Sequence, residues 1–194
     1  FWSFALPRAL EVLGQGLQGL TPDQVYRAMN IVTPGLIRVE SDEVTYNLHI
    51  MLRFDLERAM LRGDLHPSDL PAAWNDRIRS DLGLSVPDDA RGCLQDIHWS
   101  MGAVGYFPTY TLGNLYSAEI WEAVRRDLPD LDRQMASGDF QPLLAWLREK
   151  IHRHGRRWPA EELAERITGK RLSHEPLMKY LGDKLRPIYG LACP

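Results

Sequence analysis

Apolar residues along this chain recur mostly every three or four positions, which is the period of an amphipathic helix. The clearest case follows Ser41-Asp42-Glu43, where a capping residue and an acidic first turn precede one long apolar face. The residues of that face are Val44, Leu48, Met51, Leu52, Leu56, Ala59 and Met60. The pattern predicts a helix that begins near residue 44 and ends at Gly63.

Prolines, glycines and capping hydroxyls mark the ends of the other expected helices. Pro108 opens a long helix with a buried stripe, and Pro129 stops it. The remaining expected helices are one that starts near Phe1, a short one at 22–30, one behind Ser68 that ends near Gly83, and three that begin at Pro142, Pro159 and Ser173.

Residues 36–39 are partly β-branched, but the stretch is too short for more than an isolated strand or an extended loop. No internal repeat, low-complexity tract or linker separates the expected helices. We therefore expect an all-α chain in which residues 1–194 form a single helical unit. The first residue is Phe1 in a helical phrase that no capping residue precedes, so we expect the chain to be cut from a longer protein.

Composition excludes several classes of protein. The net charge of −3 is spread without long runs of one sign, which argues against a nucleic-acid or membrane-surface partner. The densest basic cluster, residues 152–158, is better read as a solvated helix end than as a ligand site. Two cysteines, Cys93 and Cys193, are too few for a disulfide scaffold, and no apolar run approaches a membrane span. A cytoplasmic location fits best.

The candidate chemistry lies in one stretch of nineteen residues that ends at Tyr110. It contains Gln95, Asp96, His98, Tyr106 and Tyr110, with glycines between them. An imidazole or a phenol can donate a hydrogen bond to an oxyanion that develops on a carbonyl under attack. The alternative is that the histidine and the tyrosines only fill a core, and spacing alone leaves both interpretations open.

Metal binding by this chain alone is not expected. Two zinc ligands on one helix face need a spacing of about four residues, and none of the six histidines has such a partner. His174-Glu175 begins like that motif but lacks its second histidine. His49 lies on a mainly apolar helix, so we interpret it as a hydrogen-bonded core histidine.

Three separated blocks resemble the signature segments of the Taq-type thermostable metallocarboxypeptidases. In chain order they are Ile37-Arg38-Val39-Glu40-Ser41-Asp42, Gly92-x-x-Gln95-Asp96-x-His98-Trp99 and Gly105-Tyr106-Phe107-Pro108. The first two resemble the family blocks IRxxAD and GxxQDxHW, and Ser41 stands where the pattern has alanine. The resemblance covers essentially the whole chain.

This resemblance implies the C-terminal part of a larger, mostly helical, zincin-like peptidase with a deep substrate groove. The family holds one divalent metal, zinc or cobalt, with an HExxH helix and a later glutamate; both segments are absent here and are expected upstream. There the metal and a glutamate activate the water that attacks the last peptide bond of a peptide. The full-length protein is then expected to be a homodimeric carboxypeptidase, and the fragment alone to be inactive.

The family mechanism implies a role for each candidate residue. Arg38 would bind the terminal carboxylate of the substrate, because a guanidinium offers paired donors; the alternative is an ordinary salt bridge to Glu40, Asp42 or another acidic residue. His98 and Tyr110 would stabilise the oxyanion, and Tyr106 could share that task. Gln95 and Asp96 would orient His98 or line the substrate groove. The competing function is a non-catalytic helical interaction module, such as a degenerate paralogue.

Overall fold

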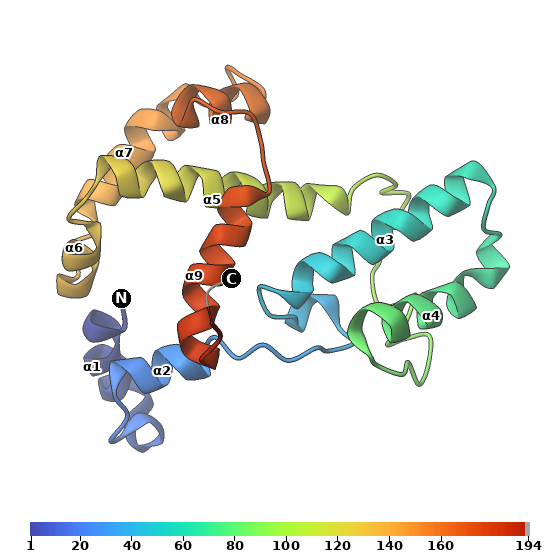
Figure 1. Ribbon diagram of the computed structural model, residues 1–194, viewed down its shortest axis with the longest axis horizontal. Coiled ribbons are helices and arrows are strands. Elements are labelled where there is room, and N and C mark those ends of the chain that lie inside the picture. The colour runs from blue at the N-terminus through green and yellow to red at the C-terminus, as the bar shows by residue number, and fades with distance from the viewer. Residues whose placement is uncertain (193–194) are drawn as a thin grey trace. The chain divides into compact units, whose positions relative to one another are not determined.

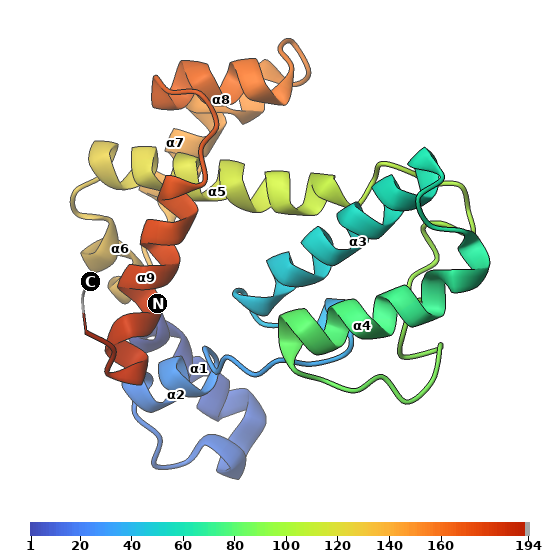
Figure 2. The same ribbon diagram turned by 45° about the vertical axis from the view of Figure 1, so that its right-hand side comes forward.

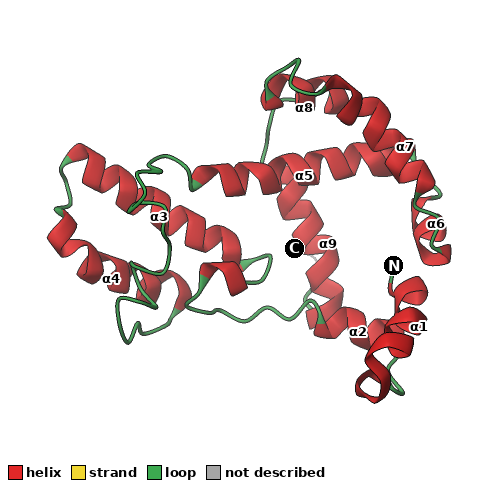
Figure 3. Cartoon of the chain, turned by 180° about the vertical axis from the view of Figure 1, so that it is seen from behind, coloured by secondary structure: helices red, strands yellow, loops and turns green. Residues whose placement is uncertain are grey.

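The computed structural model describes residues 1–192, and every regular element in that part of the chain is helical (Figures 1 and 3). The predicted all-α fold class is therefore confirmed. Cys193 lies outside the described residues. Among the helices that the structure describes, none combines the length and the apolar character that a membrane crossing requires.

The chain divides into two compact units. Unit 1 consists of Phe1–Asn30 and Leu115–Pro194, and unit 2 consists of Ile31–Asn114. The long helix α5 (Pro108–Asp127) begins in unit 2 and continues into unit 1. The expectation that residues 1–194 form one helical unit stays a prediction.

Unit 2 is built on two helices that lie side by side, α3 (Thr45–Arg62) and α4 (Leu70–Leu82) (Figures 1 and 2). Short 3-10 helices at Arg38–Glu40 and Pro67–Asp69 precede them. Both α3 and α4 end at a glycine in the left-handed conformation, as their sequences predict. Their apolar faces enclose a buried core of Leu52, Leu56, Trp74, Ile78 and Cys93.

Unit 1 contains the remaining helices. They are α1 (Trp2–Leu13), a 3-10 helix (Gly14–Leu17), α2 (Pro22–Ala28), α6 (Leu131–Ser137), α7 (Gln141–Lys150), a 3-10 helix (His152–His154), α8 (Ala160–Thr168) and α9 (Glu175–Tyr189). Its core forms where α5, α6 and α7 bury Ala123, Val124, Leu131 and Trp146. The predicted boundaries at Pro108, Pro142 and Pro159 hold to within one residue.

The start of α3 differs from the sequence prediction. Asp42, rather than Ser41, caps the helix, because its carboxylate accepts hydrogen bonds from the backbone N–H groups of Val44 and Thr45 at 2.9 and 3.0 Å. The Ser41 hydroxyl instead donates to the carbonyl of Ile37, which closes the preceding 3-10 turn. Residues 36–39 are accordingly neither a strand nor wholly an extended loop.

Three smaller expectations were wrong. Helix α6 was not predicted, since seven residues are too few for a helical period to show. Ser68 does not cap α4, because it lies inside the 3-10 turn that precedes the helix. Met51 is exposed although it was assigned to the apolar face of α3.

Candidate active site

Gln95 holds the backbone that carries Arg38. Its side-chain oxygen accepts the N–H of Arg38 at 2.9 Å, and its amide nitrogen donates to the carbonyls of Leu36 and Gly92 at 3.0 and 3.2 Å. The amide therefore joins the loop after α4 to the turn before α3. Gln95 thus holds the Arg38 segment in place, and the expectation that it orients His98 or lines the substrate groove stays a prediction.

Asp96 binds two arginines at once. One carboxylate oxygen lies 2.7 Å from Nη2 of Arg38, and the other lies 2.7 Å from Nε and 2.6 Å from Nη2 of Arg53. Arg38 also donates from Nη1 to the hydroxyl of Tyr46 at 3.0 Å. Arg38 therefore forms a salt bridge to another acidic residue, Asp96, as the alternative interpretation describes, while its role in binding the substrate carboxylate stays a prediction.

Burial and ion pairing together shift the pKa values of the Asp96 carboxyl and the Arg53 guanidinium. Burial alone would raise the pKa of the Asp96 carboxyl, but hydrogen bonds from Arg38 and the charge of Arg53 outweigh that effect and hold the pKa below its usual range. Burial lowers the pKa of the Arg53 guanidinium to about 10, against the opposing charge of Asp96. At neutral pH both arginines and the carboxylate are therefore charged.

His49 is a fully buried histidine that contacts Arg53 of this cluster. Its Nε2 donates to the carbonyl of Gly35 at 3.0 Å, which leaves Nδ1 to face Nη1 of Arg53 at 3.4 Å. Burial, followed by the charge of Arg53, lowers the pKa of His49 to about 4. The prediction of a hydrogen-bonded core histidine is confirmed.

We expect the free energy of unfolding to fall as the pH is lowered from about 6.5 to about 4. Because the pKa of His49 is about 4 in the folded protein, this imidazole takes up a proton in that pH range only in the unfolded chain. The free energy of unfolding rises with pH wherever the unfolded state binds more protons than the folded state. Urea denaturation across this range measures the slope. His49→Gln should flatten it, whereas the exposed control His152→Gln should not; an unchanged slope in His49→Gln would contradict the assignment.

His98 and Tyr110 are partners. Nε2 of His98 lies 3.1 Å from the hydroxyl of Tyr110, and the imidazole packs on Phe107 with ring centres 4.5 Å apart. Burial, and next the neighbouring Tyr106, raise the pKa of the Tyr110 phenol, so the phenol remains protonated at neutral pH. The ring of Tyr106 lies 5.5 Å from both His98 and Tyr110, but this residue is 48% exposed.

The candidate residues lie in unit 2 and gather in one place. The guanidinium carbon of Arg38 lies 4.9 Å from the ring centre of Tyr110, so the carboxylate-binding candidate and the oxyanion candidates are neighbours. Asp96 lies 3.8 Å from Nδ1 of His98, which is beyond hydrogen-bond distance. The expected orientation of His98 by Asp96 therefore stays a prediction.

Sequence reasoning missed three residues of this cluster. Tyr46, Arg53 and Glu57 were not among the expected site residues, yet Arg53 and Glu57 are only 0% and 5% exposed, and the hydroxyl of Tyr46 accepts a hydrogen bond from Arg38. The signal that was available is their spacing: His49, Arg53 and Glu57 are four residues apart and each follows an apolar position. Such a polar stripe beside an apolar stripe lies at the edge of a buried face.

The metal implied by the family resemblance does not fit the residues present. Within residues 1–192, no group of three or more His, Cys, Asp or Glu side chains is arranged to hold a metal ion. The carboxylate of Asp96 is already occupied by two guanidinium groups. The expectation that this segment alone binds no metal stays a prediction.

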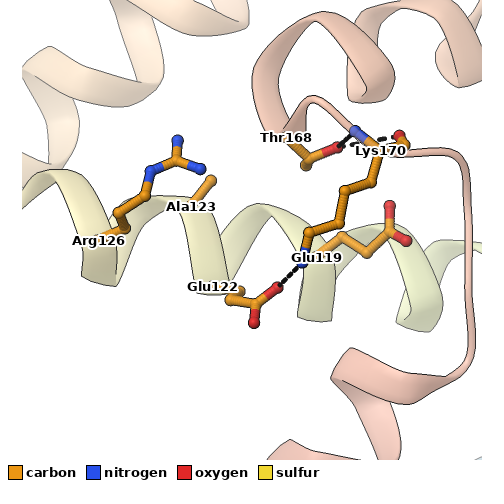
Figure 4. A pocket seen from close by; sticks show the side chains of 6 residues that line it. All are labelled: Glu119, Glu122, Ala123, Arg126, Thr168 and Lys170. Carbon is orange, nitrogen blue, oxygen red and sulfur yellow. Dashed lines mark hydrogen bonds and ion pairs between the residues drawn. The ribbon is translucent and has the colours of Figure 1, made fainter.

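A cavity of about 350 Å³ lies elsewhere, in unit 1, between α5 and the end of α8 (Figure 4). Its charged groups are largely paired, with Lys170 on Glu122 at 3.0 Å and Arg126 on Asp127 at 2.9 Å. Its lining residues are Glu119, Glu122, Ala123, Arg126, Thr168 and Lys170. None of the candidate site residues contributes to it.

Comparison with known proteins gives the family. Residues 1–185 match the model of the carboxypeptidase Taq (M32) metallopeptidases. The chain is 46% identical over 190 residues to thermostable carboxypeptidase 1 of Thermus thermophilus, a match that covers 98% of this chain and 37% of the relative. Identity to thermostable carboxypeptidase 1 of Pyrococcus furiosus is 42% over 194 residues, with 95% of this chain and 39% of the relative covered.

Comparison with solved structures supports the same family. The M32 carboxypeptidase from Deinococcus radiodurans R1 superimposes with a TM-score of 0.94 at 44% identity, over 97% of this chain and 38% of that one. Trypanosoma cruzi metallocarboxypeptidase 1 gives 0.90 at 38% identity, over 95% and 37%. The chain thus spans less than two fifths of the curated relatives described above. Since the family model matches nearly all of the sequence, the chain belongs to the carboxypeptidase Taq (M32) metallopeptidases.

Proposed function

We infer that the whole protein is a metal-dependent carboxypeptidase that hydrolyses the last peptide bond of peptides. In this proposal the present segment supplies the contacts to the terminal carboxylate of the substrate and to the oxyanion of the reaction. The names of the relatives, which are carboxypeptidases, support the activity. The same proposal includes a homodimeric enzyme and a cytoplasmic location.

One observation carries the assignment of roles: Arg38, Tyr110 and His98 are contiguous. The Arg38 guanidinium carbon is 4.9 Å from the centre of the Tyr110 ring, and the Tyr110 hydroxyl is 3.1 Å from Nε2 of His98. A substrate has its terminal carboxylate one residue away from the scissile carbonyl. The group that binds the terminal carboxylate and the groups that bind the oxygen of the scissile carbonyl must therefore lie within a few ångströms of each other.

The donors of Arg38 are only partly used by its neighbours. A guanidinium carries five N–H groups, and the contacts to Asp96 and Tyr46 engage Nε, Nη2 and Nη1. A second N–H on each terminal nitrogen is the pair that we assign to the substrate carboxylate. Asp96 and Tyr46 hold the guanidinium plane, and a side chain that is only 6% exposed loses little freedom when it binds.

The phenol of Tyr110 and the imidazole of His98 are the proposed oxyanion donors. The raised pKa of Tyr110 keeps its proton available for a hydrogen bond at neutral pH. Such donors lower the barrier because they strengthen as negative charge develops on the carbonyl oxygen. We assign the metal ion, zinc or cobalt, to ligands in the part of the whole protein beyond this chain.

The test uses the full-length protein with two blocked dipeptides that differ only in their C-terminus, a free acid and the corresponding amide. Arg38→Met should lower kcat/KM for the acid by about 10- to 10²-fold, since a hydrogen bond to a charged group contributes roughly 1.5–3 kcal/mol. Turnover of the amide, which lacks the carboxylate, should change far less.

Arg91→Met is the matched control, because Arg91 also pairs with one aspartate but on the surface. It should leave the acid-to-amide ratio unchanged. General damage from Arg38→Met would lower both rates together, so an unchanged ratio in that variant would remove the carboxylate-binding role. A full-length protein with no turnover at all would favour the non-catalytic alternative.

A further inference from the structure

Glu57 is a buried carboxylate of α3 that reaches the loop between the two motifs of the site. One oxygen accepts the indole N–H of Trp99 at 2.7 Å, and the other accepts the backbone N–H of Gly105 at 2.5 Å. Both acceptors are therefore engaged by donors from one short segment. The side chain lies in the interior of unit 2, so these bonds are shielded from water.

The two attachment points lie directly beside the candidate catalytic residues. His98 precedes Trp99, and Tyr106 follows Gly105. Between the attachment points the loop closes on itself, with Gly102 N–H donating to the carbonyl of Trp99 at 3.1 Å. The tip is solvent-exposed, whereas its two ends are fixed to α3 through a single side chain.

Backbone conformation makes the second attachment sensitive to its partner. Gly105 has φ +80°, in the left-handed region that favours glycine. The bond to Glu57 fixes the peptide N–H at that turn, and the chain then enters α5 at Pro108. Tyr106 and Tyr110 both follow this turn, so the geometry of the turn determines the positions of the two phenol rings.

We propose that Glu57 is a positioning residue that fixes the distance between His98 and the two tyrosines by binding both ends of the 99–105 loop. This inference rests on the proposed function, since the residues it positions are the proposed oxyanion donors. A displacement of about 1 Å in such groups can cost on the order of 10²-fold in rate, so a rigid attachment matters to turnover rather than to folding alone.

A carboxylate is the side chain that this position requires. An ionised glutamate is an acceptor at both oxygens, which matches two N–H donors. In Glu57→Gln one oxygen is replaced by an amide NH₂, so one of the two donors would face another donor and lose its partner. Removing the donor of Trp99 should then relieve the conflict, because the glutamine oxygen can turn to Gly105.

The experiment compares three variants of the full-length protein: Glu57→Gln, Trp99→Phe and the double variant. We expect Glu57→Gln to lower kcat by about 10- to 10²-fold while KM changes little, since only the oxyanion contacts are displaced. Trp99→Phe keeps the Gly105 attachment and should lose less kcat than Glu57→Gln, and the double variant should recover to the level of Trp99→Phe. Glu122→Gln, which makes the same change at a glutamate of unit 1 paired with Lys170, should behave as wild type.

An unchanged kcat in Glu57→Gln would overturn the proposal, as would a double variant that is no better than Glu57→Gln. A parallel rise in KM would also overturn it, because general loosening of unit 2 would disturb Arg38 as well. Should Glu57→Gln fail to fold, Trp99→Phe decides alone: it removes one of the two attachments, and full kcat would refute the positioning role. Absence of turnover in the wild-type protein would instead refute the proposed function.

Discussion

Asp96→Ala is expected to lower the free energy of unfolding by about 3–5 kcal/mol, because it leaves two buried guanidinium groups without their shared anion. Arg53 is fully buried, and Asp96 is its ion-pair partner at 2.6 Å. The cost comes mainly from the uncompensated charges and not from lost packing. Urea denaturation followed by circular dichroism measures it.

Asp132→Ala is the matched control for this change. Asp132 also forms two hydrogen bonds to one arginine, Arg125, both at 2.7 Å, but the pair is exposed in unit 1. Solvent and side-chain entropy reduce the value of such a pair to roughly 0–1 kcal/mol. If Asp96→Ala cost no more than Asp132→Ala, the buried cluster would not be the stabilising feature that its geometry indicates.

The helical part of the fold was predictable because its signals are local. Periodic apolar positions together with a terminal glycine or an initial proline place α3, α4 and α5 correctly. Which of two adjacent capping residues caps a helix does not follow from residue type alone. Asp42 caps α3 because the 3-10 turn at Arg38–Glu40 draws the Ser41 hydroxyl back to Ile37.

The candidate site was predictable only as a set of motifs. The family resemblance identified Arg38, Asp96 and His98, but the pattern did not predict that Asp96 also binds Arg53. A charged residue on a helix is usually solvated unless it is paired. The partner of Arg53 lies 43 residues further along the chain, and that of Glu57, the Trp99 indole, lies 42 residues further. Periodicity describes one helix at a time and carries no information about such pairs.

His98→Ala and Tyr110→Phe, made in the full-length protein, are each expected to lower kcat by about 10²- to 10³-fold with little change in KM. Both side chains are proposed to act on the oxyanion, which exists only in the transition state, so ground-state binding should be nearly untouched. Steady-state hydrolysis of a blocked dipeptide measures both constants. Tyr116→Phe, the same change further along α5, serves as the control and should be close to wild type.

The hydrogen bond between His98 and Tyr110 also predicts the rate of the double variant, which combines His98→Ala with Tyr110→Phe. Because Nε2 and the phenol are 3.1 Å apart, removal of either disturbs the other, and their effects should not add. The double variant should therefore be about as slow as the slower single variant. Tyr106→Phe should cost less, since Tyr106 is half exposed and contacts both residues through its ring. If Tyr106→Phe were slower than Tyr110→Phe, Tyr106 rather than Tyr110 would be the oxyanion donor. A normal kcat in all three single variants would remove the oxyanion role from this cluster.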